Sequence, residues 1–294
     1  MRAFLSVSVS AIAVMWAAHA AAEPDWSKVD ATLERAGAVQ PGGIHRYGFP
    51  RGDLHVTVDG VTIKPALALG GWVAFQAMND NTAMIMGDLV LTETEVSPVM
   101  AKLLDSGVEV TAVHNHLLRA SPEPLYMHIG GHGDAVRLAV AIRSALALSA
   151  TPPAAPSGTS APAIDLDTVK LDEAMGAKGK ANGGVYQFSV PRRDPVTENS
   201  MTIPASMGTA NGANFQPTGD GKAAVTGDFV VTAEEVNPLI RSLRTSGIEV
   251  TAIHSHMLDE QPRLFFVHFW ANDDAVKLAK GLRGALDQTA AAKM

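Results

Sequence analysis

An internal duplication is the feature that most constrains how this chain folds. When the sequence is compared with itself at an offset of 140 residues, Gly87–Ala147 aligns without a gap on Gly227–Asp287, and 27 of the 61 positions are identical. Weaker matches precede this region: Gly42-Gly43 with Gly183-Gly184, Thr62-Ile63 with Thr202-Ile203, and Phe75-Gln76 with Phe215-Gln216. A repeat of this length predicts two copies of one structural unit in tandem.

The segment between the two copies predicts where each unit begins and ends. Residues 149–163, "SATPPAAPSGTSAPA", consist mostly of Pro, Ala and Ser and carry no charge. Such a segment has no apolar face to bury, so it is expected to be a linker. The predicted units are therefore residues 23–148 and 164–294.

Residues 1–22 have the composition of a secretory signal peptide. Arg2 supplies a short positive region, an apolar stretch follows, and small residues precede Glu23. The apolar stretch is too short and too rich in serine to span a bilayer. We therefore expect a periplasmic or secreted protein with no stable membrane insertion after the signal is removed.

Each copy shows the same order of predicted elements. A short strand at residues 87–92 leads to a helix, then to a strand at residues 108–117, a polar turn, another strand and a final helix that starts at Asp134. This β-α-β-β-α order predicts the α+β class, with two tandem homologous units that each have an antiparallel sheet and helices on one face. A hairpin is expected to turn at Asp59-Gly60.

The first helix of each copy has two candidate starts. Ser97 and Asn237 are good N-caps that would put the following proline at the first helical position. Thr92 with Glu95, repeated as Thr232 with Glu235, also fits a capping box. The later start is preferred because the earlier one places a proline inside the helix.

Charge and cysteine content exclude several classes of function. The net charge is −7 and no cluster of Lys and Arg is present, which argues against nucleic acid and against an anionic membrane surface as partners. There are no cysteines, so disulfides, zinc–thiolate sites, a cysteine nucleophile and lipid attachment through cysteine are excluded.

Two histidine pairs end equivalent apolar strands, in "VTAVHNHLL" and "VTAIHSHML". Side chains alternate along a strand, so His114 and His116 are expected to point the same way. A turn centred on Ser121 would place His128 directly across from His114. Three histidines with one open position is the ligand set of catalytic zinc sites, and copper or nickel also suit it. We predict one site for zinc, or another divalent transition metal, in each unit: His114, His116 and His128 in the first, and His254, His256 and His268 in the second.

The alternative is that these are partly buried, hydrogen-bonded strand residues. Val108, Val110 and Ala112 share the expected face of the strand, so a helix could cover the histidines.

No general base or fourth ligand emerges from the sequence. Glu123 is replaced by Arg263 in the second copy. Acidic pairs present in both copies are expected to form turn or strand-end hydrogen bonds (Asp88 and Asp228) or to lie on the opposite strand face (Glu109 and Glu249). Arg51 and Asp53 are expected in a surface loop.

Long motifs resemble a known family. The stretches "GDLVLTETEV", "EVTAVHNHLL", "LYMHIGGHGDA", "TGDFVVTAEEVNP" and "RLFFVHFWANDDAVKLA" are similar to those of the LppY/LpqO-type family of bacterial secreted proteins of unknown function. The resemblance covers nearly the whole chain after residue 22. It implies export but no activity. Similar members include mycobacterial lipoproteins, whose lipid-bearing cysteine is absent here.

Three functions remain open at this point, and whether the protein is an enzyme stays undecided. The first is a periplasmic protein that binds a transition-metal ion through the six histidines. The second is a metal-dependent hydrolase of the cell envelope, in which an open position on the ion activates water. The third is a metal-free ligand-binding or scaffolding module whose two copies form a groove for an unknown envelope ligand.

Overall fold

The computed structural model describes residues 23–78, 82–154 and 162–293. The predicted signal peptide lies outside these residues. No helix in the described ranges is both long enough and apolar enough to cross a membrane.

The first unit is a six-stranded antiparallel sheet with helices packed on one face. Its strands, in sheet order, are β1 (Ala38–Gln40), β2 (Ile44–Pro50), β5 (Gly70–Ala77), β6 (Ala83–Leu91), β8 (Leu125–Gly133) and β7 (Glu109–His114). Its helices are α1 (Trp26–Leu33), α3 (Glu93–Asp105), α4 (Ala135–Leu146) and the short α2 (Pro65–Ala68). A two-stranded hairpin of β3 (Thr57–Val58) and β4 (Val61–Thr62) turns at Asp59-Gly60, as predicted.

The second unit repeats this plan. Its strands, in sheet order, are β15 (Glu249–His254), β17 (Phe265–Asp274), β14 (Lys222–Val231), β13 (Ala210–Gly219), β10 (Val185–Pro191) and β9 (Lys180–Asn182). Its helices are α5 (Thr168–Met175), α6 (Ala233–Thr245), α7 (Ala275–Leu286) and the 3₁₀ turn η1 (Ala205–Met207). A small sheet joins β12 (Met201–Ile203), β11 (Val196–Glu198) and β16 (Glu260–Gln261). The predicted α+β class, the two tandem units, their β-α-β-β-α order and the placement of the helices are confirmed.

Helix α3 begins at the capping box, so the expectation of a later start after Ser97 is wrong. Thr92 is the N-cap, the Glu95 carboxylate accepts a hydrogen bond from the Thr92 N–H, and Pro98 lies inside the helix. Glu95 also accepts from the guanidinium of Arg51 at 2.7 Å, and Arg51 is buried rather than in a surface loop. The cap and this charge-assisted hydrogen bond stabilise the early start enough to offset the proline. Helix α6 repeats the pattern with Thr232 and Glu235.

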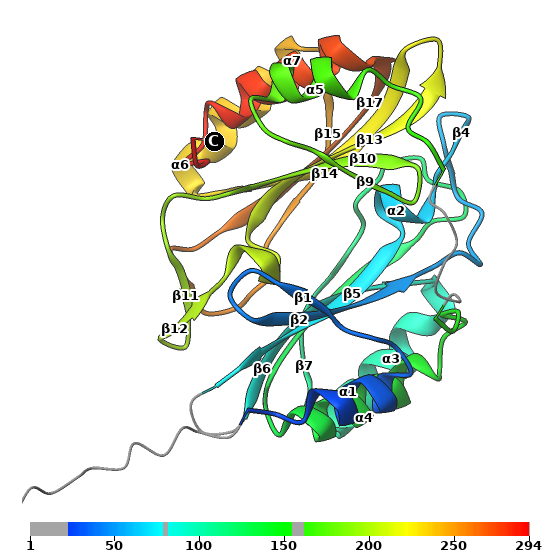
Figure 1. Cartoon of the computed structure of the whole chain (residues 1–294), viewed down its shortest axis with the longest axis vertical. Helices are drawn as coiled ribbons and strands as arrows, with labels where there is room; N and C mark the ends of the chain where they lie inside the picture. Colours follow the sequence, from blue (N-terminus) through cyan, green and yellow to red (C-terminus); the bar gives the residue numbers. More distant parts are fainter. Residues whose placement is uncertain (1–22, 79–81, 155–161, 294) are drawn as a thin grey trace, which may run out of the picture.

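The two sheets face each other, and the longer helices lie on the outside of both (Figure 1). The short α2 lies between the sheets, against β13 and β14 of the second unit. Strands β6 and β14 are therefore covered on both faces, which explains why "AMIMGDLVL" reads as a nearly continuous apolar run. Two apolar clusters combine residues of both units between the sheets. One contains Met86 and Phe266, and the other contains Tyr126 and Trp270.

A pair of equivalent hydrogen bonds also joins the units. The hydroxyl of Thr111 donates to the carbonyl of His256 at 2.6 Å, and that of Thr251 donates to the carbonyl of His116 at 2.6 Å. Both threonines occupy a β-bulge, in β7 and in β15. A bulge re-aims the chain locally, and here it points a hydroxyl at the opposite unit.

Candidate metal centre

The bulge at Thr111 sets the direction of the histidines. Before it, Val110 pairs with Ile129; after it, Ala112 pairs with His128 and His114 pairs with Tyr126. The prediction that His128 lies directly across from His114 is therefore wrong, because the strand pairing is not centred on Ser121. The bulge adds one residue to β7 and reverses which side chains of this strand face each side of the sheet after it.

The same bulge changes which residues share the face of the histidines. Val110 packs against the core under the helices, whereas His114 faces the second unit. The possibility that a helix covers the histidines is thus excluded for this strand. Glu109, paired with Gly130 and lining a cavity with His256, lies on the interface side, so its expected opposite orientation is wrong.

All six predicted histidines lie in one cluster between the units, rather than in two separate patches. Each ring stacks on a ring of the other unit: His114 on His254 at 3.5 Å between ring centroids, His128 on His256 at 3.6 Å, and His116 on His268 at 3.8 Å. Tyr126 and Phe266 close the two ends, stacking on His116 at 3.4 Å and on His256 at 3.3 Å.

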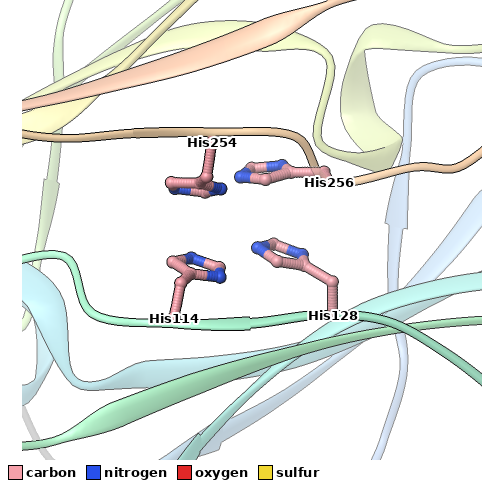
Figure 2. A group of neighbouring side chains, drawn as sticks. All are labelled: His114, His128, His254 and His256. Atoms are coloured by element: carbon pink, nitrogen blue, oxygen red, sulfur yellow. The ribbon is translucent and has the colours of Figure 1, made fainter.

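Within one unit, neighbouring rings lie side by side. The rings of His114 and His128 are 5.0 Å apart with an interplanar angle of 4°, and those of His254 and His268 are 4.8 Å apart with an angle of 7°. Figure 2 shows four of the rings as two layers, His254 and His256 above His114 and His128. The layers bring ring nitrogens of both units close together: one nitrogen from each of these four residues lies within 4.8 Å of all the others.

Most of the rings present a buried nitrogen with no hydrogen-bond partner among the described residues. These atoms are Nδ1 of His114 and Nε2 of His128, His254, His256 and His268. Buried polar atoms are nearly always paired, so five such atoms in one cluster require an explanation. A bound ion that accepts their lone pairs is one.

Hydrogen bonds to the other ring nitrogen orient two of these rings. Nδ1 of His268 lies 3.0 Å from the carbonyl oxygen of Gly227, and His128 makes the equivalent contact with Gly87. A carbonyl only accepts, so Nδ1 carries the proton and Nε2 is left as a lone pair. Metal-binding histidines commonly have this arrangement.

Burial keeps the cluster uncharged at neutral pH. It lowers the pKa of His114 to about 3 and that of His254 to about 4, and for His114 the neighbouring His254 lowers the pKa further. The pKa values of His116, His128, His256 and His268 fall well below the usual range for the same reason, with repulsion between the rings added. Neutral imidazole is the form that binds metal.

Two carboxyl groups border the cluster. Asp88 and Asp228 lie in the middle of β6 and β14, directly across from His128 and His268. Oδ1 of Asp88 is 4.0 Å from Nε2 of His128 and has no hydrogen-bond partner among the described residues. Burial raises the pKa of Asp88 and raises that of Asp228 to about 7.

These carboxyl positions correct the expectation that Asp88 and Asp228 form turn or strand-end hydrogen bonds. Each is close enough to two histidines of its own unit to share an ion with them. The sequence shows only that the aspartate is present in both copies. The strand register that places it beside the histidines could not be deduced from the sequence. Glu123 instead accepts a hydrogen bond from the Asn115 side chain.

A cleft of about 850 Å³ between the units reaches one end of the cluster. Its walls include His116, His268, Asp88, Asp228 and Arg46. The opposite end of the cluster, at His256, borders a cavity of only about 100 Å³. The end at His116 and His268 therefore borders a cleft large enough for a small molecule, whereas the end at His256 borders only a small cavity.

Comparison with known proteins identifies the family. A family model described as Domain of Unknown Function (DUF1259) matches residues 27–148 and again residues 169–288. The chain therefore belongs to this family and contains the domain twice. Among curated proteins, no match was found.

Two solved structures are similar at low level. A trimeric bacterial microcompartment shell protein, PduB, is 14% identical with a TM-score of 0.20, covering 85% of this chain and 88% of its own. EtuB from Clostridium kluyveri is 8% identical with a TM-score of 0.20, covering 85% and 90%. Likenesses this weak support no conclusion about function or assembly.

Proposed function

We propose that the protein binds a divalent transition-metal ion, zinc being the first candidate, in a centre built from histidines of both units. The observation that carries the proposal is the group of buried, unpaired ring nitrogens between the sheets. Their burial, their neutral state and the fixed tautomers of His128 and His268 are the properties that metal-binding imidazoles share.

Four residues make the best ligand set: His114, His128, His254 and His256. Each offers a buried ring nitrogen without a hydrogen-bond partner in the described structure. A second group consists of His114, His116, His254 and His268, but there Nε2 of His114 already lies 2.8 Å from Nε2 of His116. The first group is therefore the proposed primary centre.

The chemistry of the donors limits the ion. A set of imidazole nitrogens suits Zn²⁺, Cu²⁺ or Ni²⁺, whereas Mg²⁺ and Ca²⁺ prefer oxygen. The lone pairs of parallel rings lie in separate planes, so coordination by all four requires rotation about the terminal side-chain torsions. The stacked rings are 3.5 and 3.6 Å apart, so these rotations must take the rings out of the stack to direct their lone pairs at one ion.

Export is the second part of the proposal. The composition of residues 1–22 and the resemblance to LppY/LpqO-type secreted proteins support a periplasmic or secreted location. In that compartment, a cysteine-free site of histidines would hold the ion without being subject to thiol oxidation.

A metal-dependent hydrolase of the cell envelope is the second candidate function. Asp88 and Asp228 favour it, since they place carboxyl groups beside the histidines at the wall of the 850 Å³ cleft. A carboxyl with a raised pKa can serve as general base or acid. Turnover of ester, phosphoester or peptide substrates that is abolished by a chelator would support this candidate, and its absence on all three classes would exclude it.

Metal content tests the proposed function directly. Purified protein should be stripped with a chelator, dialysed, incubated separately with zinc, copper and nickel, and freed of excess ion before elemental analysis. We expect about one tightly held ion per chain. Content that stays well below one ion per chain for all three metals would contradict the proposal and leave a metal-free binding module.

A further inference from the structure

Arg46 is the notable charged group of the cleft outside the histidine cluster. Among the described residues, it is the only Lys or Arg that lines the 850 Å³ cleft. Burial lowers its pKa to about 10; Asp88 and Asp228 are near enough to favour its charge, but neither forms an ion pair with it in the described structure. The guanidinium has five N–H donors in a planar fork. A charged group in a cleft without an ionic partner is available to a ligand.

The structure holds this guanidinium in a fixed position. It lies over the Trp72 ring, 3.7 Å from the centroid, and donates from Nη1 to the carbonyl of Ser206 at 3.0 Å. Gly208 of the second unit packs closely on the Trp72 ring, since a Cβ added at this glycine would come within 2.9 Å of the ring. Trp72 is therefore confined by Arg46 and by the second unit, and residues of both units position the guanidinium.

The rest of the cleft is lined by polar side chains and two carboxyl groups. Asn214, Gln187 and Thr226 line it, together with the carboxyl groups of Asp88 and Asp228. Asp88 and Asp228 act electrostatically on Arg46, and burial raises the pKa of both carboxyl groups. Arg46 is therefore the favourable position in the lining for a negative group. The carboxyl groups can accept hydrogen bonds from hydroxyl or amino groups of the same ligand.

We propose that the cleft binds a small polyhydroxylated or amino-bearing molecule through one oxyanion, a carboxylate or a phosphate, held by Arg46 and Trp72 next to the histidine cluster. The inference rests on the proposed function only in that the bound molecule would lie beside the metal centre. The contact with Arg46 requires no metal. Arg is the side chain best suited to a bidentate contact with either oxyanion.

The experiment uses the full chain, stripped of metal, and three probes: glucose 6-phosphate, gluconate and uncharged glucose. Binding is measured by calorimetry and by the tryptophan fluorescence change, which Trp72→Phe should reduce. We expect at least one oxyanion probe to bind more tightly than glucose, and the stronger of the two shows whether phosphate or carboxylate is preferred. Arg46→Gln should weaken that binding at least about tenfold.

Two further variants separate the roles of charge and fold. Arg143→Gln removes a surface arginine that pairs with Glu34, outside the cleft, and should bind like the wild type. Arg46→Lys keeps the charge without the fork and should lie between wild type and Arg46→Gln. Equal binding of glucose and both oxyanions, or equal affinity in wild type and Arg46→Gln, would overturn the proposal. The titration with the three probes is then repeated after zinc addition. If the protein binds no zinc, the proposed metal centre fails, but the probe affinities measured without metal still test the role of Arg46.

Discussion

Replacing His114 and His254 together with glutamine is expected to weaken zinc binding by at least about 100-fold. These two residues form the central stack and belong to both four-histidine groups, so the double variant removes two nitrogens from either ligand set. Loss of a residue that only orients a ligand already costs about 10–100-fold in affinity, and loss of two direct ligands should cost more. Competition against a chromophoric chelator measures the change.

A matched control is His132→Gln. His132 is an exposed histidine of β8 that hydrogen-bonds Thr82 and belongs to none of the ligand groups found in the described structure. It became Asn272 in the second copy. We expect zinc affinity of this variant to stay within about threefold of wild type. If the double variant and the His132→Gln control bind zinc with equal affinity, the ion is not held by His114 and His254.

The metal-free protein should lose stability steeply as the pH falls below about 6.5. The unfolded chain has histidines with pKa values near 6.5, whereas burial lowers the folded-state values, to about 3 for His114 and about 4 for His254. Below pH 6.5 the unfolded chain therefore binds more protons, and the free energy of unfolding decreases with falling pH. Each proton contributes about 1.4 kcal/mol per pH unit.

Asp88 and Asp228 act in the opposite direction. Their pKa values are raised in the folded state, to about 7 for Asp228, so the folded chain holds those protons as the pH falls toward 3.8. Six histidines less two aspartates leave a net uptake of about four protons on unfolding. Denaturant titrations at pH 7.5, 6.5, 6.0 and 5.5 measure the slope.

The double variant His114→Gln/His254→Gln is also the control for this prediction. Removing two titrating rings should reduce the slope by about 2.8 kcal/mol per pH unit, at two protons. Added zinc should stabilise the wild-type protein at each pH by binding only the folded state. A free energy of unfolding that is constant from pH 7.5 to 5.5 would mean that the histidines are not buried as described.

The sequence was sufficient to predict the duplicated α+β architecture. The 140-residue repeat, the strand patterns and the helix caps each depend on local residues, and the hairpin at Asp59-Gly60 follows from turn chemistry. The helix start was wrong because the buried Arg51, far away in the chain, stabilises the capping box through Glu95. That contact is tertiary and leaves no local pattern.

The candidate site was predictable in its residues but not in its geometry. Counting along the strand named all six histidines, yet the bulges at Thr111 and Thr251 changed their direction. Nothing in a single copy of the repeat indicates that its histidine-bearing face packs on the same face of the other copy. Because that packing decides the number of centres, the sequence indicated two sites where the structure has one cluster.

Crystallography of the zinc-loaded protein, with anomalous scattering measured on both sides of the zinc edge, tests the shared centre most directly. We expect an anomalous peak between the two sheets, about 2.0–2.1 Å from ring nitrogens of His114 or His128 and also of His254 or His256. A peak coordinated by residues of one unit only, or one located away from the histidines, would contradict the proposed centre.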